Sequence, residues 1–111
     1  MKIKELNISS LKRLIDIGDP FIVKYKSDNC QTCLDIKEDY EWVSERLAPI
    51  GFYEVDTDRE PELAEVFTSD GVPTLFYIKG EEMTEIYYPE EGYTRKTLFK
   101  AIASKTGTKN V

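Results

Sequence analysis

Apolar residues recur along the chain with two periods, one typical of helices and one typical of strands. In residues 9–17, a spacing of three or four places Leu11, Leu14 and Ile15 on one face, as in an amphipathic helix that covers a core. The run Gly18-Asp19-Pro20 follows directly and predicts the end of this helix. A short strand over residues 3–6 is expected before it.

The segment 21–25, Phe-Ile-Val-Lys-Tyr, is rich in β-formers and nearly continuous in apolar character. This composition predicts a strand covered on both faces, as in parallel sheets. Residues 33–47 return to a helical period, which predicts one amphipathic helix. The apolar residues that set this period are Ile36, Tyr40, Val43 and Leu47. Trp42 has a place in the same helix and is interpreted as a packing residue.

The rest of the chain continues the alternation and ends with a hairpin and a helix. The predicted elements are a strand at 52–55, a short helix from Pro61, a strand at 74–78, a turn at 79–82, a return strand at 83–88, and a helix capped by Thr94 and closed by Gly107. Strands that alternate with helices, followed by a hairpin, indicate an α/β fold with a central mixed sheet and helices on both faces. The length of 111 residues suits a single domain over residues 1–111.

Composition and charge exclude several classes of function. Lys and Arg number 15 and Asp and Glu 21, which gives a net charge of −6 and argues against binding to nucleic acid or anionic membranes. Histidine is absent, so catalytic triads, Cys–His dyads and histidine metal sites are excluded. No apolar run of a signal peptide or membrane span is visible. We expect a cytoplasmic monomer.

The only two cysteines form the motif Cys30-Gln31-Thr32-Cys33, between the strand at 21–25 and the helix that follows. Free N–H groups at a helix start stabilise a thiolate, so Cys30 is suited to attack a disulfide and Cys33 to resolve the product. Two alternatives remain. The cysteines are inert apolar residues, or two chains share a metal ion or cluster, since one CxxC supplies only two of the four ligands that zinc prefers.

With Gly71-Val72-Pro73-Thr74 before a strand, and Tyr53-Glu54-Val55-Asp56 in the preceding one, the chain resembles the thioredoxin family over almost its whole length. The resemblance implies a thioredoxin-like fold with a redox-active centre and no bound cofactor or metal. It implies Cys30 as nucleophile, Cys33 as resolving thiol and Pro73 as a cis-proline. Val72 would contact the backbone of the substrate.

The chain departs from the family pattern at the cysteine pair and beneath it. Gln31 and Thr32 replace the Gly-Pro of thioredoxins and are expected to tune the redox potential. Lys24 stands where the family has a buried Asp six residues before the nucleophile. Glu54 lies on the next strand and on the same face as the family's partner lysine. The two therefore form a charge-swapped pair that relays a proton for the cysteines, or Lys24 extends to the surface and no relay exists.

The favoured function is that of a thiol–disulfide oxidoreductase that reduces or exchanges protein disulfides as Cys30 and Cys33 cycle between dithiol and disulfide. Such an enzyme contributes to electron transport and cell redox homeostasis, and its electrons would come from a separate reductase or a low-molecular-weight thiol. The alternatives are a redox-inactive binding module of the same fold and a metal- or cluster-bridged dimer.

Overall fold

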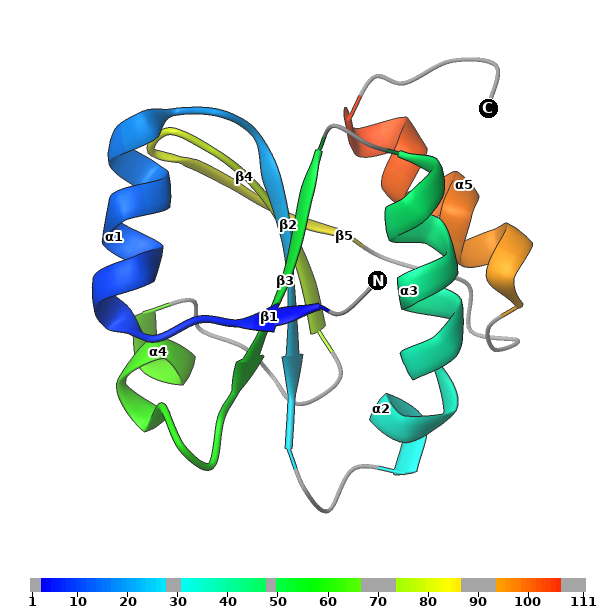
Figure 1. Ribbon diagram of the computed structural model, residues 1–111, viewed down its shortest axis with the longest axis horizontal. Coiled ribbons are helices and arrows are strands. Elements are labelled where there is room, and N and C mark those ends of the chain that lie inside the picture. The colour runs from blue at the N-terminus through cyan, green and yellow to red at the C-terminus, as the bar shows by residue number, and fades with distance from the viewer. Residues whose placement is uncertain (1–2, 28–30, 48–49, 67–73, 87–93, 107–111) are drawn as a thin grey trace.

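The computed structural model describes residues 3–27, 31–47, 50–66, 74–86 and 94–106 (Figure 1). Its elements are β1 (Lys4–Glu5), α1 (Ile8–Ile17), β2 (Phe21–Lys26), α2 (Gln31–Asp35), α3 (Lys37–Arg46), β3 (Gly51–Asp56), α4 (Pro61–Val66), β4 (Thr74–Lys79), β5 (Glu82–Ile86) and α5 (Arg95–Thr106). The predicted order of elements is confirmed, including the short first strand, except that two helices replace the one predicted over residues 33–47.

Five strands form one mixed sheet in the order β1-β3-β2-β4-β5. Strand β3 runs parallel to both β1 and β2, whereas β4 runs antiparallel to β2 and β5. Helices α1 and α4 cover one face, and α2, α3 and α5 lie over the other (Figure 1). The predicted α/β fold with helices on both faces is confirmed.

Strand β2 divides its side chains between two apolar cores because successive residues of a strand point to opposite faces. Val23 and Tyr25 belong to the core beneath α1 and α4, where they join Leu11 and Ile78. Ile22 belongs to the core beneath α3 and α5. Residues of β2 on that second side, at alternate positions from Ile22, therefore point to the face covered by α2, α3 and α5, and α2 holds Cys33.

Helix α1 begins one residue before the predicted start, and a capping box sets its beginning. The Asn7 side chain accepts a hydrogen bond from the Ser10 amide, and the Ser10 hydroxyl accepts one from the Asn7 amide, both at 2.9 Å. Gly18 ends the helix in the left-handed conformation, with φ of 87°, which glycine adopts without steric cost. This helix places Leu11 on the sheet.

The single helix predicted over 33–47 is wrong in one respect, because the structure has two helices that meet at Ile36. Ile36 has φ of −93° and ψ of −1°, and its carbonyl accepts the Tyr40 amide at 2.8 Å to start α3. The four apolar residues that predicted the helix are all buried, and they run from the residue before α3 to the residue after it. In α2, Cys33 is buried as well, whereas Leu34 is 60% exposed.

The hairpin and the last helix also follow the sequence pattern. Gly80 turns the chain between β4 and β5 with φ of 60°, and the Thr94 hydroxyl oxygen accepts the Thr97 amide at 3.1 Å at the start of α5. The predicted end of the return strand and the closing Gly107 lie outside the described residues. No helix in the described part of the chain has the length and apolar character needed to cross a membrane.

Candidate functional site

The second cysteine of the motif lies in α2, near the end of the sheet where β2 stops. Cys33 is 4% exposed, and its sulfur is disulfide-bonded. Gln31 begins the helix, and its side-chain amide donates to Asp35 Oδ1 at 2.9 Å. Thr32 is helical as well, while Cys30 lies outside the described residues. The motif's second half is thus held on a short helix directly above the sheet.

Beneath α2 and α3, Lys24 of β2 and Glu54 of β3 form a buried ion pair. The two residues are register partners on the parallel strands, and Lys24 Nζ lies 3.0 Å from Glu54 Oε2. Their side chains are only 1% and 9% exposed. The contact expected from the sequence is therefore present, and the alternative in which Lys24 extends to the surface is wrong.

The surroundings of the pair oppose the charge on Lys24. Burial is the main cause that lowers the Lys24 pKa, and the attraction of Glu54 acts against that shift. Lys24 Nζ also lies 4.7 Å from the centre of the Tyr40 ring, a distance at which the ring face attracts a cation. The Tyr40 hydroxyl donates to the Tyr53 carbonyl at 2.8 Å, and burial raises the Tyr40 pKa. This tyrosine consequently stays neutral beside the pair.

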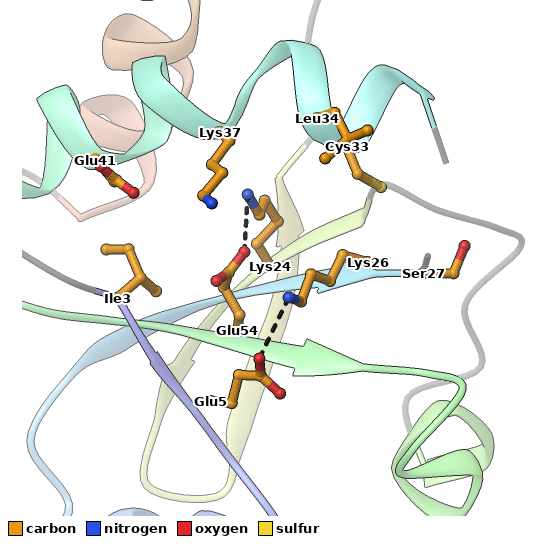
Figure 2. A pocket seen from close by; sticks show the side chains of 10 residues that line it. All are labelled: Ile3, Glu5, Lys24, Lys26, Ser27, Cys33, Leu34, Lys37, Glu41 and Glu54. Carbon is orange, nitrogen blue, oxygen red and sulfur yellow. Dashed lines mark hydrogen bonds and ion pairs between the residues drawn. The ribbon is translucent and has the colours of Figure 1, made fainter. Parts of the chain in front are cut away.

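A pocket of about 560 Å³ connects the cysteine to the ion pair (Figure 2). Cys33, Lys24 and Glu54 all line it, and in Figure 2 the cysteine lies on the helix above the pair. A second pair, Lys26 Nζ to Glu5 Oε2 at 3.3 Å, lies on the same wall and is more exposed. The pocket gives solvent and small solutes a path toward the buried charges below Cys33.

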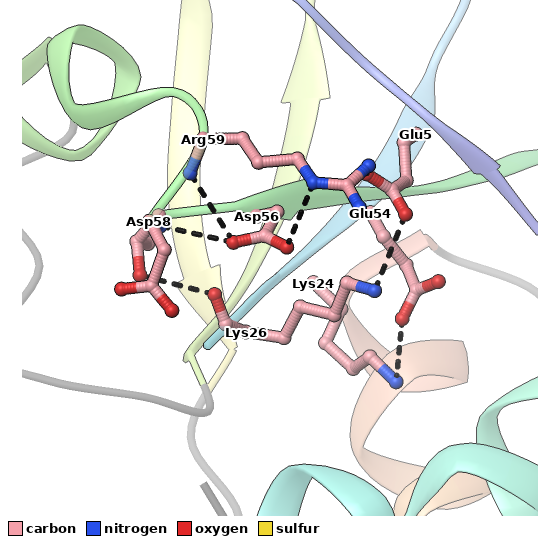
Figure 3. Close-up of polar contacts among 8 residues, drawn as sticks. Glu5, Lys24, Lys26, Glu54, Asp56, Asp58 and Arg59 are labelled. Atoms are coloured by element: carbon pink, nitrogen blue, oxygen red, sulfur yellow. Dashed lines mark hydrogen bonds and ion pairs between the residues drawn. The ribbon is translucent and has the colours of Figure 1, made fainter. Parts of the chain in front are cut away.

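Further polar contacts hold the strand ends around this pocket (Figure 3). Asp56 at the end of β3 is 3% exposed and accepts the Asp58 amide at 2.9 Å. Arg59 reaches from the turn to both Asp56 and Glu5, at 3.8 and 3.7 Å. No sequence pattern predicts the contacts of Glu5, Lys26 and Arg59, because only the folded sheet brings β1 beside β3.

The structure brings three of the predicted site residues, Cys33, Lys24 and Glu54, to one pocket. Cys30, Val72 and Pro73 lie outside the described residues, so their predicted roles stay predictions. Within the ranges that the structure describes, no group of three or more Cys, Asp and Glu side chains is placed to hold a metal ion.

The family model described as thioredoxin matches residues 2–104 of the 111. The chain belongs to the thioredoxin family. The match covers every described strand and most of α5, so the resemblance noted from the sequence and the thioredoxin fold are both confirmed. No curated protein matched the chain.

Solved structures of thioredoxins share the fold at low sequence identity. Mitochondrial thioredoxin 3 from Saccharomyces cerevisiae, in an oxidised form, has a TM-score of 0.78 and 20% identity, covering 92% of this chain and 94% of its own. Thioredoxin from Trypanosoma brucei brucei has a TM-score of 0.80 and 13% identity, covering 96% and 92%. A J-Trx1 fragment of ERdj5 has a TM-score of 0.81 and 14% identity, covering 96% of this chain and 52% of the fragment.

Proposed function

We propose that this thioredoxin-family protein is a thiol–disulfide oxidoreductase that reduces or exchanges protein disulfides through Cys30 and Cys33. The observation that carries the proposal is the position of Cys33, which is buried and disulfide-bonded on a short helix above the sheet. The chain holds only one other cysteine, three residues earlier. Family membership supports the same chemistry.

In the proposed cycle, the Cys30 thiolate attacks one sulfur of a substrate disulfide and releases the other as a thiolate, which takes up a proton. The Cys33 thiol then loses its proton and attacks Cys30, which frees the second substrate thiol. Two electrons thus pass from the cysteine pair to the substrate, and the two protons that the substrate thiols take up come from Cys33 and from solvent. A separate reductase or a low-molecular-weight thiol restores the dithiol, and we propose that the protein acts as a cytoplasmic monomer without a bound cofactor.

We further propose that the Lys24–Glu54 pair supports the step at Cys33. The pair lines the pocket that Cys33 also lines, and the positive charge of Lys24 favours the thiolate form of a nearby thiol. Glu54 accepts the proton that Cys33 releases, directly or through water in the pocket, which makes it a positioning and proton-accepting residue. Gln31 and Thr32, at the start of α2, would set the redox potential.

Insulin reduction with dithiothreitol as the donor tests the main proposal. We expect the wild-type protein to accelerate precipitation of the insulin B chain, and Cys30→Ser to abolish the acceleration, because the attacking sulfur is gone. A wild-type rate equal to that of Cys30→Ser would contradict the proposal and favour a binding module.

Metal analysis of freshly purified protein checks the bridged-dimer alternative. Equilibration with thiol buffers then measures the redox potential of the cysteine pair. A value of about −270 mV is typical of a reductase, and a value of about −120 mV is typical of an oxidant.

The relay is tested with Glu54→Gln, which keeps the shape of the side chain and removes its basic oxygen. We expect the mixed disulfide on Cys30 to resolve about a hundredfold more slowly, the lower end of the range of losses for a general base, and the pH profile of resolution to change. Glu5→Gln is the matched control, because Glu5 lines the same pocket and also pairs with a lysine. Equal rates for Glu54→Gln and the wild type would show that no relay exists.

A further inference from the structure

A second pocket, of about 540 Å³, lies between α3 and α5 and shares no lining residue with the pocket below Cys33. The two helices lie side by side over the sheet (Figure 1). Trp42 of α3 and Phe99 of α5 are its aromatic residues, with ring centres 6.0 Å apart at an interplanar angle of 71°. This edge-to-face pair leaves aromatic surface toward the pocket, and both side chains are only half-buried.

Three cationic side chains complete the lining of this aromatic pocket. The Arg46 guanidinium lies over the Trp42 ring, 3.8 Å from its centre, and donates to the Trp42 carbonyl at 3.3 Å. Lys96 and Lys100 lie one turn apart on α5 and are exposed. A guanidinium stacked on a ring keeps N–H groups at its edge that can bind a carboxylate in a bidentate way.

These three cations have no carboxylate partner in the part of the chain that the structure describes. By contrast Arg95, which also approaches the Trp42 ring at 5.2 Å, is paired with Asp39 at 3.1 Å. The protein as a whole carries a net charge of −6. These three cations around two aromatic rings, unpaired among the described residues, are therefore opposite in sign to the molecule as a whole, and they attract anions.

We propose that this pocket binds a small amphiphilic anion, a planar aromatic ring that carries a carboxylate. The volume of about 540 Å³ falls in the range of small-molecule sites, roughly 300–1,000 Å³. The ring of the ligand packs against Trp42 and Phe99, and its carboxylate binds Arg46 and the two lysines. A stable protein interface buries about 800 Å² of surface on each partner. The five residues that line this pocket offer less surface than that.

Trp42 is the only tryptophan, so its indole N–H gives a single side-chain resonance that reports on the pocket. We would titrate ¹⁵N-labelled protein with 2-naphthoate and with the neutral analogue 2-naphthamide. We expect a saturable shift of the indole signal, with naphthoate binding about tenfold more tightly than the amide, or ~1.4 kcal/mol. The absence of saturation, or equal affinity for the amide, would overturn the proposal. An indole shift that depends on protein concentration alone would show that a second copy fills the pocket, and it would also overturn it.

The variant Lys96→Gln/Lys100→Gln removes the charge of two exposed lining residues without touching the core. We expect naphthoate to bind about fivefold more weakly to it, since exposed ion pairs each contribute little, and the amide to bind as before. Lys79→Gln/Lys105→Gln is the matched control, with the same loss of charge at exposed positions outside the pocket. An equal loss in both variants contradicts a local site. Insulin reduction by Lys96→Gln/Lys100→Gln should equal that of the wild type, so this test stands apart from the redox proposal.

Discussion

The two faces of the sheet differ in what they bury. Beneath α1 and α4 the core residues are apolar, and the tyrosine among them, Tyr25, satisfies its hydroxyl by donating to the Leu63 carbonyl at 2.8 Å. Beneath α3 and α5 an apolar core is present as well, but the Lys24–Glu54 pair lies within the same layer with almost no exposure. One strand, β2, contributes to both environments.

The two faces differ in how much their buried residues contribute to stability, because one buries apolar side chains and the other also buries an ion pair. Two charges taken out of water lose hydration that their mutual attraction only partly repays, so apolar residues of similar volume usually stabilise a core as well or better. The face beneath α1 and α4 follows that rule. The other face departs from it at the wall of the pocket that Cys33 lines, where the proposed proton relay would need a pair of this kind.

Removal of one partner from the pair should have the largest effect on stability. We expect Glu54→Leu to lower the free energy of unfolding by about 3–5 kcal/mol, because it leaves the Lys24 ammonium buried without a partner. Urea unfolding followed by circular dichroism measures the change. The double variant Lys24→Met/Glu54→Leu is the control, and we expect it to equal or exceed the wild type. If the single variant is as stable as the double variant, the pair is not desolvated as the structure indicates.

A deletion on the opposite face tests whether that face is held by packing alone. Ile78 is fully buried in β4, and Ile78→Ala should lower the free energy of unfolding by roughly 3 kcal/mol through lost contacts and the cavity that remains. Ile78→Val, which removes a single methylene, should lower it by about 1 kcal/mol. Equal losses in the two variants would mean that the core closes around the cavity.

The pH dependence of stability should distinguish the two faces as well. Burial lowers the Lys24 pKa in the folded protein, below the value of about 10.4 for an unfolded lysine. Between these two values the unfolded chain binds more protons, so this group makes the folded state more stable as the pH rises. We expect the wild type to gain stability relative to Lys24→Met/Glu54→Leu as the pH rises toward about 10, measured by urea unfolding. Ile78→Val should show no difference of this kind from the wild type.

The smallest expected effect concerns the helix that covers the apolar face. Asn7→Ala removes the side chain that caps α1 and should lower the free energy of unfolding by about 1 kcal/mol. Thermal unfolding detects this change. Ser9→Ala is a suitable control because Ser9 is exposed in the same turn and takes no part in the capping box; a loss of the same size there would assign the effect to helix propensity instead.

The sequence predicts the features that depend on the regular spacing of side chains along strands and helices. The alternation of side chains along strands was enough to predict that Lys24 and Glu54 share a face, and the structure confirms their contact. The break at Ile36 was not predicted, because the chain has no proline or glycine there and the turn depends on how α2 packs. Likewise Lys26 and Glu5 form their pair only after β1 takes its place beside β3.

The pocket between α3 and α5 also depends on contacts between separate elements, which the sequence does not predict. The sequence predicts that Trp42 is a packing residue, and it does contact Phe99. Its other neighbours come from two helices that are far apart in the sequence, Arg46 on α3 and the lysines on α5. A period within one helix identifies which residues share its face, but not which side chains of another helix will meet them.

The pairing of the strands also has a consequence for how the protein is made. Strands β1 and β2 are translated first, yet β1 pairs with β3, and β2 pairs with β3 and β4. When a nascent chain has left the ribosome only as far as α3, strands β1 and β2 are present, but β3 and β4, with which they pair, are not. It can form local helices, but the sheet, the Lys24–Glu54 contact and the pocket below Cys33 all wait for β3 to emerge. Until then the cysteine motif is exposed to the cell's own thiols on an unfolded chain.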